Sequence, residues 1–345
     1  MKLKHIHIDS YKVFQDFDID FCKTTSPFLP QDIIVLAGVN GMGKTTLLKE
    51  IIASQELVDG RTMTFYDDAI KDDFIAHHTP LQASLKYKFD GILFLPAAEM
   101  SLTQLESYVL TYLDKLVFED DRTSAEAYRN IQSIMDDIFG KLDLHIHFTG
   151  IDRNRKLLFS NDSGDTFGME ALSSGEKQIM GKIFPLFTGD IRDKIVLMDE
   201  PEESLHPSWQ IQLLPIIRRC AEKTNCQFIL ATHSPHIIAS AKQEELRLLV
   251  RDDEGKIKAV ECSEGPYGWT VEKVLNEIQQ VPYNRVPEME RELSELRGMI
   301  NNGEYDTPKF KEMFQIVETT LGSDPYLSLL RMEIARRRKQ HEADK

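Results

Sequence analysis

The sequence predicts an α/β fold with a mainly parallel central sheet, and three observations support this prediction. Continuous apolar runs recur at residues 33–37, 92–95, 195–198 and 228–231, as expected of strands that are covered on both faces. Helical periodicities lie between these runs, and strands that alternate with helices form mainly parallel sheets. A glycine-rich turn directly follows the first run.

Composition and charge narrow the class of protein. The length of 345 residues predicts one large domain with a smaller appendage, and the net charge of −15 weighs against broad attraction to nucleic acid. No segment approaches the ~20 apolar residues of a membrane-spanning helix. The first residues, MKLKH, lack the apolar region of a secretory signal, so we expect a cytoplasmic protein without membrane contact. Four cysteines without C-x-x-C spacing fit reduced, buried thiols: Cys22, Cys220, Cys226 and Cys262.

The elements follow one another from the N-terminus. Residues 6–21 alternate between apolar and polar, a period of two that predicts opening antiparallel strands. The apolar run at 33–37 predicts a buried strand, and the glycine-rich turn after it leads into a helical pattern. Residues 101–140 carry three- and four-residue apolar steps, and residues 144–160 return to strand character. We therefore expect a short helical arm and a hairpin, inserted over residues 101–165.

The C-terminal part is predicted to be helical. Beyond about residue 266 the strand pattern ends, and apolar stripes at helical spacing take its place. Gly322 can end one of these helices, and Asp324 can cap the next. We therefore divide the chain into residues 1–265 and a helical region at residues 266–345.

The strongest motif is GVNGMGKT at residues 38–45, which fits G-x-x-x-x-G-K-[ST] between a strand and a helix. Its backbone N–H groups and the helix N-terminus favour phosphate. Lys44 would reach the β- and γ-phosphates, and the Thr45 hydroxyl would ligate Mg²⁺, so we expect ATP and Mg²⁺ as ligands. The candidate nucleotide-binding residues here are Gly38, Asn40, Gly41, Gly43, Lys44, Thr45 and Thr46.

Two carboxylates follow the apolar run at residues 195–198. A carboxylate at the C-terminal end of a strand lies where ligands bind in α/β sheets. Asp199 would hold Mg²⁺, as a Walker B aspartate does, and together with Thr45 it forms the predicted metal site. Glu200, one residue further on, suits a general base that polarises the attacking water.

Two further motifs resemble those of the ABC superfamily. Residues 172–178, LSSGEKQ, resemble the ABC signature in the form found in SMC-, RecF- and Rad50-like ATPases. Residues 232–234, THS, resemble the H-loop, in which His233 would donate to the γ-phosphate and act with Glu200 in catalysis. Signature residues of that superfamily contact the nucleotide of a second subunit, so the resemblance implies a head-to-tail homodimer with two ATP sandwiches. The residues concerned are Ser173, Ser174, Gly175 and Glu176.

The Walker B region narrows the resemblance to the OLD-type ATPases and their AAA-labelled relatives. Residues 199–207, DEPEESLHP, carry His206 where transporter and SMC subunits usually carry an aspartate, and the His-Pro form is typical of the OLD group. The resemblance covers about residues 1–250. It implies an ABC/OLD-like ATPase domain at residues 1–265 and leaves residues 266–345 as a candidate partner-docking region.

The sequence departs from the superfamily pattern in two places. A Q-loop glutamine is expected after the strand that ends near Pro96, but the sequence there reads AAEM, with Glu99 and Gln104 as the nearest candidates. OLD nucleases continue into a Toprim domain with an acidic metal cluster. No such arrangement is recognisable after His233, so we expect that the chain does not cut DNA itself.

The favoured function is an ATPase subunit that regulates a separate effector. The chain has the organisation of a stand-alone OLD-like ATPase with a helical tail. In this respect it resembles the PtuA-type ATPases of Septu anti-phage systems and the ATPases of related retron systems. In Septu the ATPase is paired with an HNH endonuclease. The resemblance therefore implies a homodimer, open to higher assembly, that controls a nuclease or another effector carried on a separate polypeptide.

Two other functions are considered. A RecF-like DNA-repair ATPase would clamp DNA directly, with Arg153, Arg155 and Lys156 on the hairpin as candidate phosphate contacts, although the acidic balance weighs against it. The nucleotide-binding subunit of a membrane transporter is the other, and the form of the signature, His206 and the helical tail argue against it.

Overall fold

The computed structural model describes most of the chain, in two compact units, Met1–Gln280 and Val281–Lys345. In the described part of the chain, no helix is long and apolar enough to cross a membrane. The residues described are 1–53, 61–67, 71–77, 91–96, 101–142, 144–189, 191–281 and 285–343.

Six strands form the central sheet of the first unit, in the order β15-β14-β5-β13-β12-β8. Neighbours pair in parallel from β14 to β8, and only the edge strand β15 is antiparallel to its neighbour. The predicted mainly parallel sheet is therefore confirmed. The strands are β5 (Ile33–Ala37), β8 (Ile92–Leu95), β12 (Ile195–Asp199), β13 (Gln227–Ala231), β14 (Leu246–Arg251) and β15 (Ile257–Val260).

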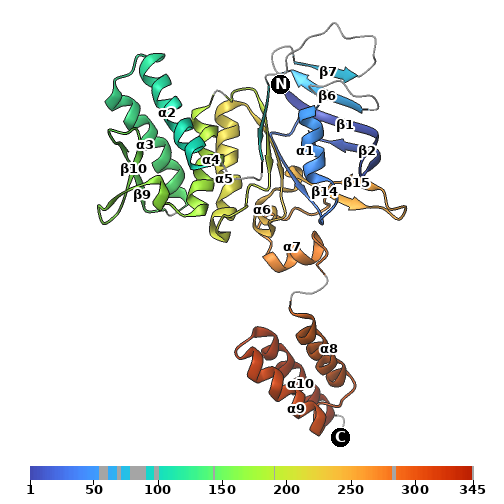
Figure 1. Cartoon of the computed structure of the whole chain (residues 1–345). Helices are drawn as coiled ribbons and strands as arrows, with labels where there is room; N and C mark the ends of the chain where they lie inside the picture. The colour runs from blue at the N-terminus through green and yellow to red at the C-terminus, as the bar shows by residue number, and fades with distance from the viewer. Residues whose placement is uncertain are drawn as a thin grey trace. The chain divides into compact units, whose positions relative to one another are not determined.

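The central strands are continuously apolar because both faces of the sheet are covered. On β5, Ile34 and Leu36 pack into one core, together with α1 (Lys44–Ala53), while Ile33 and Val35 pack into the other. Figure 1 shows α1 and an antiparallel sheet on one side of the central strands, and α4 and α5 on the other. These two helices are α4 (Ser174–Thr188) and α5 (Pro207–Thr224).

The predicted N-terminal antiparallel strands form a second sheet, in the order β2-β1-β6-β7. Its buried face is built from the alternating positions of the sequence, such as Ile6 and Ile8, which are fully buried. The two-stranded ribbon β3–β4 comes between β2 and β5 in the chain. The strands are β1 (Lys2–Tyr11), β2 (Phe14–Asp20), β3 (Cys22–Lys23), β4 (Ser26–Pro30), β6 (Arg61–Asp67) and β7 (Asp72–His77).

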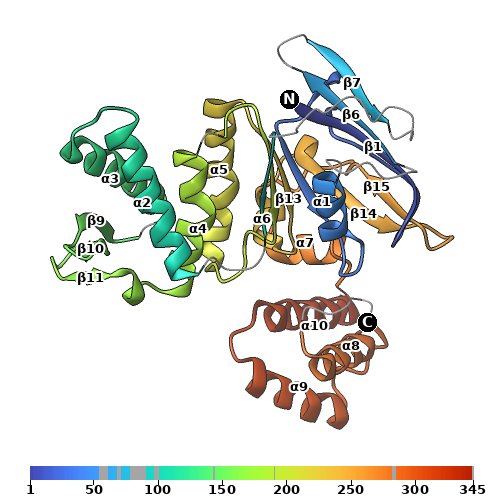
Figure 2. The same ribbon diagram turned by 45° about the horizontal axis from the view of Figure 1, so that its top comes forward.

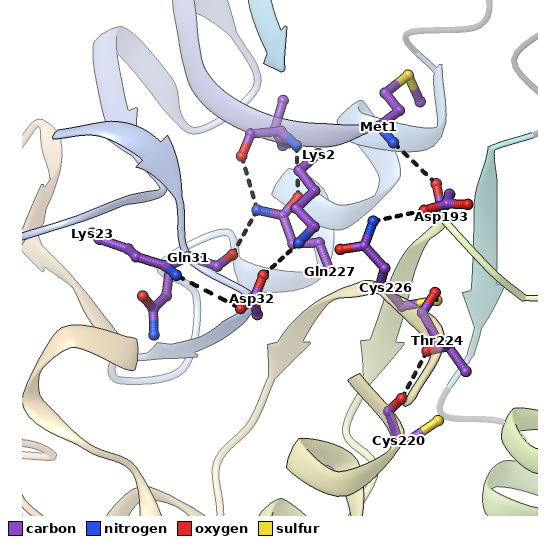
Figure 3. A network of polar contacts seen from close by, with 12 residues as sticks. Met1, Lys2, Lys23, Gln31, Asp32, Asp193, Cys220, Thr224, Cys226 and Gln227 are labelled. Carbon is purple, nitrogen blue, oxygen red and sulfur yellow. Dashed lines mark hydrogen bonds and ion pairs between the residues drawn. The ribbon is translucent and has the colours of Figure 1, made fainter. Parts of the chain in front are cut away.

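A polar network ties β1 to the N-terminal ends of the central strands (Figure 3). The buried Gln227 side chain accepts from the Leu3 N–H at 2.6 Å and donates to the carbonyls of Leu3 at 2.8 Å and Gln31 at 3.0 Å. The Lys2 ammonium donates to the Asp32 carboxylate at 2.6 Å. The network holds the two sheets together at the opposite end of the strands from the glycine-rich loop.

The four cysteines are free thiols, as predicted, although Cys262 is half-buried. The Cys220 thiol donates to the Leu186 carbonyl at 3.3 Å. Burial raises the pKa of Cys220 to about 11, so this thiol stays protonated at neutral pH.

The insertion consists of two helices, as predicted, and of a three-stranded sheet where the sequence predicted a hairpin that ends at residue 165. The helices α2 (Leu102–Phe118) and α3 (Ser124–Lys141) are followed by the strands β9 (Ile146–Ile151), β10 (Leu157–Asn161) and β11 (Thr166–Gly168). Figure 2 shows this arm beside α4, on the side of α4 that faces away from α1. A 3₁₀ turn, Met169–Ala171, leads from the arm into α4.

Two short helices complete the first unit, α6 (Pro235–Ser240) and α7 (Val271–Glu277). A 3₁₀ turn at Gln243–Glu245 lies between them. Val274 and Ile278 are buried in the same core as α6, so α7 belongs with the first unit. The compact units therefore divide after Gln280, whereas the sequence division at residue 265 falls before α7.

The second unit is a three-helix bundle with its own apolar core. Its helices are α8 (Pro287–Asn301), α9 (Pro308–Leu321) and α10 (Pro325–Ala343). Leu296, Ile300, Val317 and Leu327 are fully buried in that core. Gly322 ends α9 and Asp324 caps α10, as the sequence predicts.

Candidate ATP-binding site

The loop between β5 and α1 has a conformation that glycine adopts freely. Gly38, Gly41 and Gly43 have φ angles of +143°, +81° and +82°, which side-chain-bearing residues rarely adopt. A Cβ atom on Gly38 would lie 2.5 Å from the Leu249 carbonyl oxygen. The loop can therefore turn its N–H groups toward a phosphate at the N-terminus of α1.

Lys44 is the first residue of α1 and is only 5% exposed. Its ammonium donates to the carbonyls of Gly38 at 2.6 Å and Val39 at 3.2 Å. Burial lowers the pKa of Lys44 to about 8, although the nearby carboxylates, Glu200 first, act in the opposite direction. A bound phosphate would replace the hydration that this ammonium has lost.

The structure brings the two predicted metal-binding residues together. The Thr45 hydroxyl donates to the Asp199 carboxylate at 2.9 Å. A hydroxyl and a carboxylate supply only oxygen ligands, which is the donor set that Mg²⁺ prefers. Of the other predicted loop residues, Asn40 is exposed and Thr46 is half-buried in α1.

The two predicted catalytic residues face each other at the ends of β12 and β13. The His233 Nε2 atom lies 3.7 Å from Glu200 Oε1, and the Lys44 ammonium lies 3.4 Å from His233 Nδ1. Because an ammonium can only donate, His233 Nδ1 is the acceptor, and the proton of the neutral ring is on Nε2. Burial lowers the pKa of His233, which favours this neutral form.

Glu200, the predicted general base, lies in a turn whose backbone is held by β13. Burial raises the pKa of Glu200, and the neighbouring carboxylates Glu202, Asp199 and Glu203 raise it further. Its backbone lies in the left-handed region, with φ +43°. The Glu200 N–H donates to the Ala231 carbonyl at 2.8 Å, so β13 fixes the start of this turn.

Glu202 is a site residue that the motif analysis did not identify. Its Oε1 atom accepts from the Thr232 hydroxyl at 2.6 Å, the His233 N–H at 2.7 Å and the Ser234 N–H at 2.9 Å. One carboxylate oxygen thus fixes the backbone of the H-loop. The signal in the sequence was the acidic run DEPEE, but nothing in the run says which carboxylate reaches the H-loop.

Two glutamines also contact the H-loop. Gln210 on α5 accepts from the Ser234 hydroxyl at 2.5 Å and donates to the Leu205 carbonyl at 2.9 Å. Gln279, just after α7, donates to the His233 carbonyl at 2.7 Å. His233 is therefore bonded at its N–H by Glu202 and at its C=O by Gln279.

The signature residues form the exposed N-terminus of α4. The Ser173 hydroxyl accepts from the Glu176 N–H at 3.3 Å, and the Glu176 carboxylate accepts from the Ser173 N–H at 2.6 Å. Both Ser173 and Ser174 are exposed. Gly175 is buried, and a Cβ atom there would lie 2.6 Å from the Trp209 ring and 3.0 Å from the Ser204 carbonyl. Glycine is thus required here by close packing against α5.

The Q-loop candidates are not brought to this site by any described contact. Glu99 lies outside the described residues. Gln104 caps α2, where its side chain accepts from the Ser101 N–H at 2.9 Å.

The candidate DNA contacts on the hairpin are largely neutralised. Arg155 forms a two-pronged hydrogen bond with Asp114, at 2.8 and 2.9 Å, and Lys156 donates to Glu106 at 2.7 Å. Two of the three predicted phosphate contacts therefore already have carboxylate partners on α2.

A glycine-rich loop, an aspartate, a glutamate and a histidine at the ends of adjacent parallel strands define a P-loop ATPase of ABC type. The chain belongs to the family described as "AAA domain, putative AbiEii toxin, Type IV TA system", whose model matches residues 57–239. That match includes the signature, Walker B and H-loop residues and begins after the glycine-rich loop.

Three curated relatives support the expected resemblance. The chain is 27% identical to the Septu protein PtuA of Bacillus thuringiensis over 216 residues, which cover 58% of this chain and 54% of that protein. It is 28% identical to the "Retron Ec83 probable ATPase" of Escherichia coli, over 41% of this chain and 26% of that protein. It is 33% identical to the OLD nuclease of Thermus scotoductus, over 27% of this chain and 17% of that protein. The chain thus matches about half of the length of PtuA and less of the others.

The solved structures confirm the fold class. The head domain in "Crystal structure of the SmcHead bound to the C-winged helix domain of ScpA" has a TM-score of 0.53 and 14% identity. The match covers 76% of this chain and 98% of that chain. At this identity the likeness shows the fold alone.

Proposed function

We propose that this chain binds and hydrolyses ATP as a head-to-tail homodimer and thereby regulates a separate effector in anti-phage defence. The observation that carries the proposal is the division of the site. Within the chain, Thr45 contacts Asp199, and Lys44 and Glu200 both lie close to His233. The signature serines instead lie on an exposed helix N-terminus. A second copy would supply that helix end to the nucleotide.

The residues divide the chemistry of hydrolysis between them. Lys44 and the loop N–H groups bind the phosphates, while Thr45 and Asp199 hold Mg²⁺, which neutralises the developing charge when it is bound. Glu200 accepts a proton from the attacking water. His233 keeps its Nε2 proton and donates a hydrogen bond from Nε2 to the γ-phosphate.

The effector is proposed to be a separate polypeptide, such as an HNH endonuclease, that docks on the C-terminal helices. Similarity to PtuA and to the retron ATPase supports a place in a defence system. The second unit has a groove of about 520 Å³ between α9 and α10, with Phe310 and Phe314 in its wall. Lys311, Arg331 and Arg338 also line it, but Arg331 pairs with Glu318 and Arg338 with Asp306. The apolar wall is therefore the part of this surface that supports docking of a segment of the effector. In this proposal the chain itself does not cut DNA.

The test combines assembly, ATP binding and partner retention. Light scattering of the full chain with ATP and Mg²⁺ should show a dimer, and Ser173→Arg should leave a monomer that still binds ATP. The wild type, tagged and purified from its native host, should retain a nuclease that a chain without residues 285–345 loses. A monomer in all conditions would refute the dimer. Retention of the nuclease by the truncated chain would refute docking, and ATP-strengthened, salt-sensitive binding of duplex DNA without any partner would favour the DNA clamp.

A further inference from the structure

A buried lysine joins the signature helix to the catalytic glutamate. Lys182 lies on α4, is 6% exposed, and its ammonium donates to the Glu200 carbonyl at 3.1 Å. A lysine buried this deeply is rare in proteins unless its ammonium has a partner. No motif of the sequence includes it.

The surroundings of Lys182 are acidic. Four carboxylates act on its pKa in the upward direction: Glu203, Glu202, Asp199 and Glu200. Burial has the larger effect and lowers the pKa of Lys182. The Lys182 ammonium is therefore a buried cation directed at the Walker B turn. Because an apolar side chain of the same length could fill the same space, packing alone does not require a lysine here.

The Glu200 backbone needs to be held on both sides. Its φ angle of +43° is unfavourable for a residue with a side chain. The N–H is held by the Ala231 carbonyl at 2.8 Å, from β13. The C=O accepts from the Glu203 N–H at 3.1 Å, within the turn, and from the Lys182 ammonium at 3.1 Å, from α4. Lys182 is thus the side chain that ties this carbonyl to the signature helix, while the other two bonds come from the backbone.

We propose that Lys182 is a positioning residue, which holds the Glu200 carbonyl so that the carboxylate faces His233 and the attacking water. The proposal rests on the function proposed above for Glu200. The bond of Lys182 goes to the backbone of the turn that carries the base, so the residue acts through that turn.

The same bond links the two halves of the composite site. Ser173 and Lys182 are on one helix, about 13 Å apart along its axis. A second subunit's nucleotide would contact the N-terminus of α4, while Lys182 on the same rigid helix holds the base of this subunit. Binding of the partner's nucleotide to the helix N-terminus would therefore affect Glu200 directly through α4 and Lys182.

The test compares Lys182→Met, Lys182→Arg and a control lysine outside the site. Lys115→Met removes an exposed ammonium in the last turn of α2. Lys182→Met should lower kcat about 10- to 100-fold and leave KM for ATP within about threefold, since the loss affects the transition state alone. Lys182→Arg should recover part of kcat, and Lys115→Met should match the wild type.

Each outcome decides between a positioning and a packing role. Unchanged kcat in Lys182→Met would overturn the inference while leaving the proposed function intact. A parallel loss of thermal stability, ATP binding and kcat, without rescue by arginine, would show a packing role only and would also overturn it. A wild-type chain without ATP turnover, or full turnover in Glu200→Gln, would overturn both the inference and the proposed function.

Discussion

Removal of the Glu202 carboxylate should destabilise the H-loop by an amount that can be worked out from its hydrogen bonds. Glu202→Ala takes the acceptor from the Thr232 hydroxyl and the His233 N–H, whereas the Ser234 N–H keeps a second acceptor, Thr232 Oγ1, at 3.0 Å. Thr232 is fully buried. Each buried donor left without a partner costs about 1–3 kcal/mol, so two of them cost about 2–6 kcal/mol. We expect about 2–4 kcal/mol, since water can enter where the carboxylate was.

The assay is urea unfolding followed by tryptophan fluorescence. The two tryptophans, Trp209 and Trp269, both lie in the first unit, so their signal reports that unit and not the three-helix bundle. Glu202→Gln keeps an acceptor oxygen and should lose only about 1 kcal/mol. Glu203→Ala removes an exposed carboxylate next in sequence and should stay within about 0.5 kcal/mol of the wild type.

Turnover provides a second readout of the same variants. Because Glu202 fixes the backbone of His233, Glu202→Ala should also lower kcat, in the folded protein at low urea, more than Glu203→Ala does. The reasoning is refuted if Glu202→Ala and Glu203→Ala lose the same stability, or if Glu202→Gln is as damaging as Glu202→Ala.

Four further predictions follow from the site. Glu200→Gln should bind ATP without hydrolysing it, and the trapped ATP should stabilise the dimer. A persistent monomer in light scattering with ATP would contradict this. Because a phosphate raises the depressed pKa of Lys44 from about 8, ATP binding should take up a proton above that pH. The affinity of the chain for ATP should therefore weaken by up to about tenfold per pH unit toward pH 10. A constant affinity in titration calorimetry over this range would contradict the prediction. Gly175→Ala should lower the free energy of unfolding by about 1–3 kcal/mol, because the added methyl group would collide with the Trp209 ring. Wild-type stability in urea unfolding would contradict this. Gln279→Ala should lower kcat about three- to tenfold at unchanged ATP affinity, and a lower affinity at unchanged kcat would speak against it.

The sequence predicted those parts of the site that local chemistry determines. Phosphate binding needs glycines beside one lysine, and this need appears as a short motif at residues 38–45. Lys182 and Gln279 could not be predicted in the same way. Each acts on a backbone carbonyl of a residue 18 or 46 positions away in the sequence, and a carbonyl places no constraint on residue type. Only the fold brings these donors and acceptors together.

The boundary between the two units shows the same limit. The apolar spacing of α7 resembles that of the helices after it, since an amphipathic pattern says that one face is buried but not which core receives it. Val274 packs into the core of the first unit, and Leu296, on the next helix, packs into that of the second. The division after Gln280 therefore depends on tertiary contacts that periodicity does not encode.

The position of Gln279 suggests how the second unit could influence catalysis. Its amide holds the His233 carbonyl, and the second unit begins only two residues later, at Val281. Ile278, just before Gln279, is buried in the first unit. If a partner docks on the three-helix bundle, as we propose, its effect could reach His233 along the chain through Gln279 and the His233 carbonyl, while Glu202 still holds the N–H. On this reasoning Gln279→Ala should abolish the effect of the partner on turnover even where it leaves partner binding unchanged, and a partner effect of wild-type size in that variant would show that the coupling takes another route.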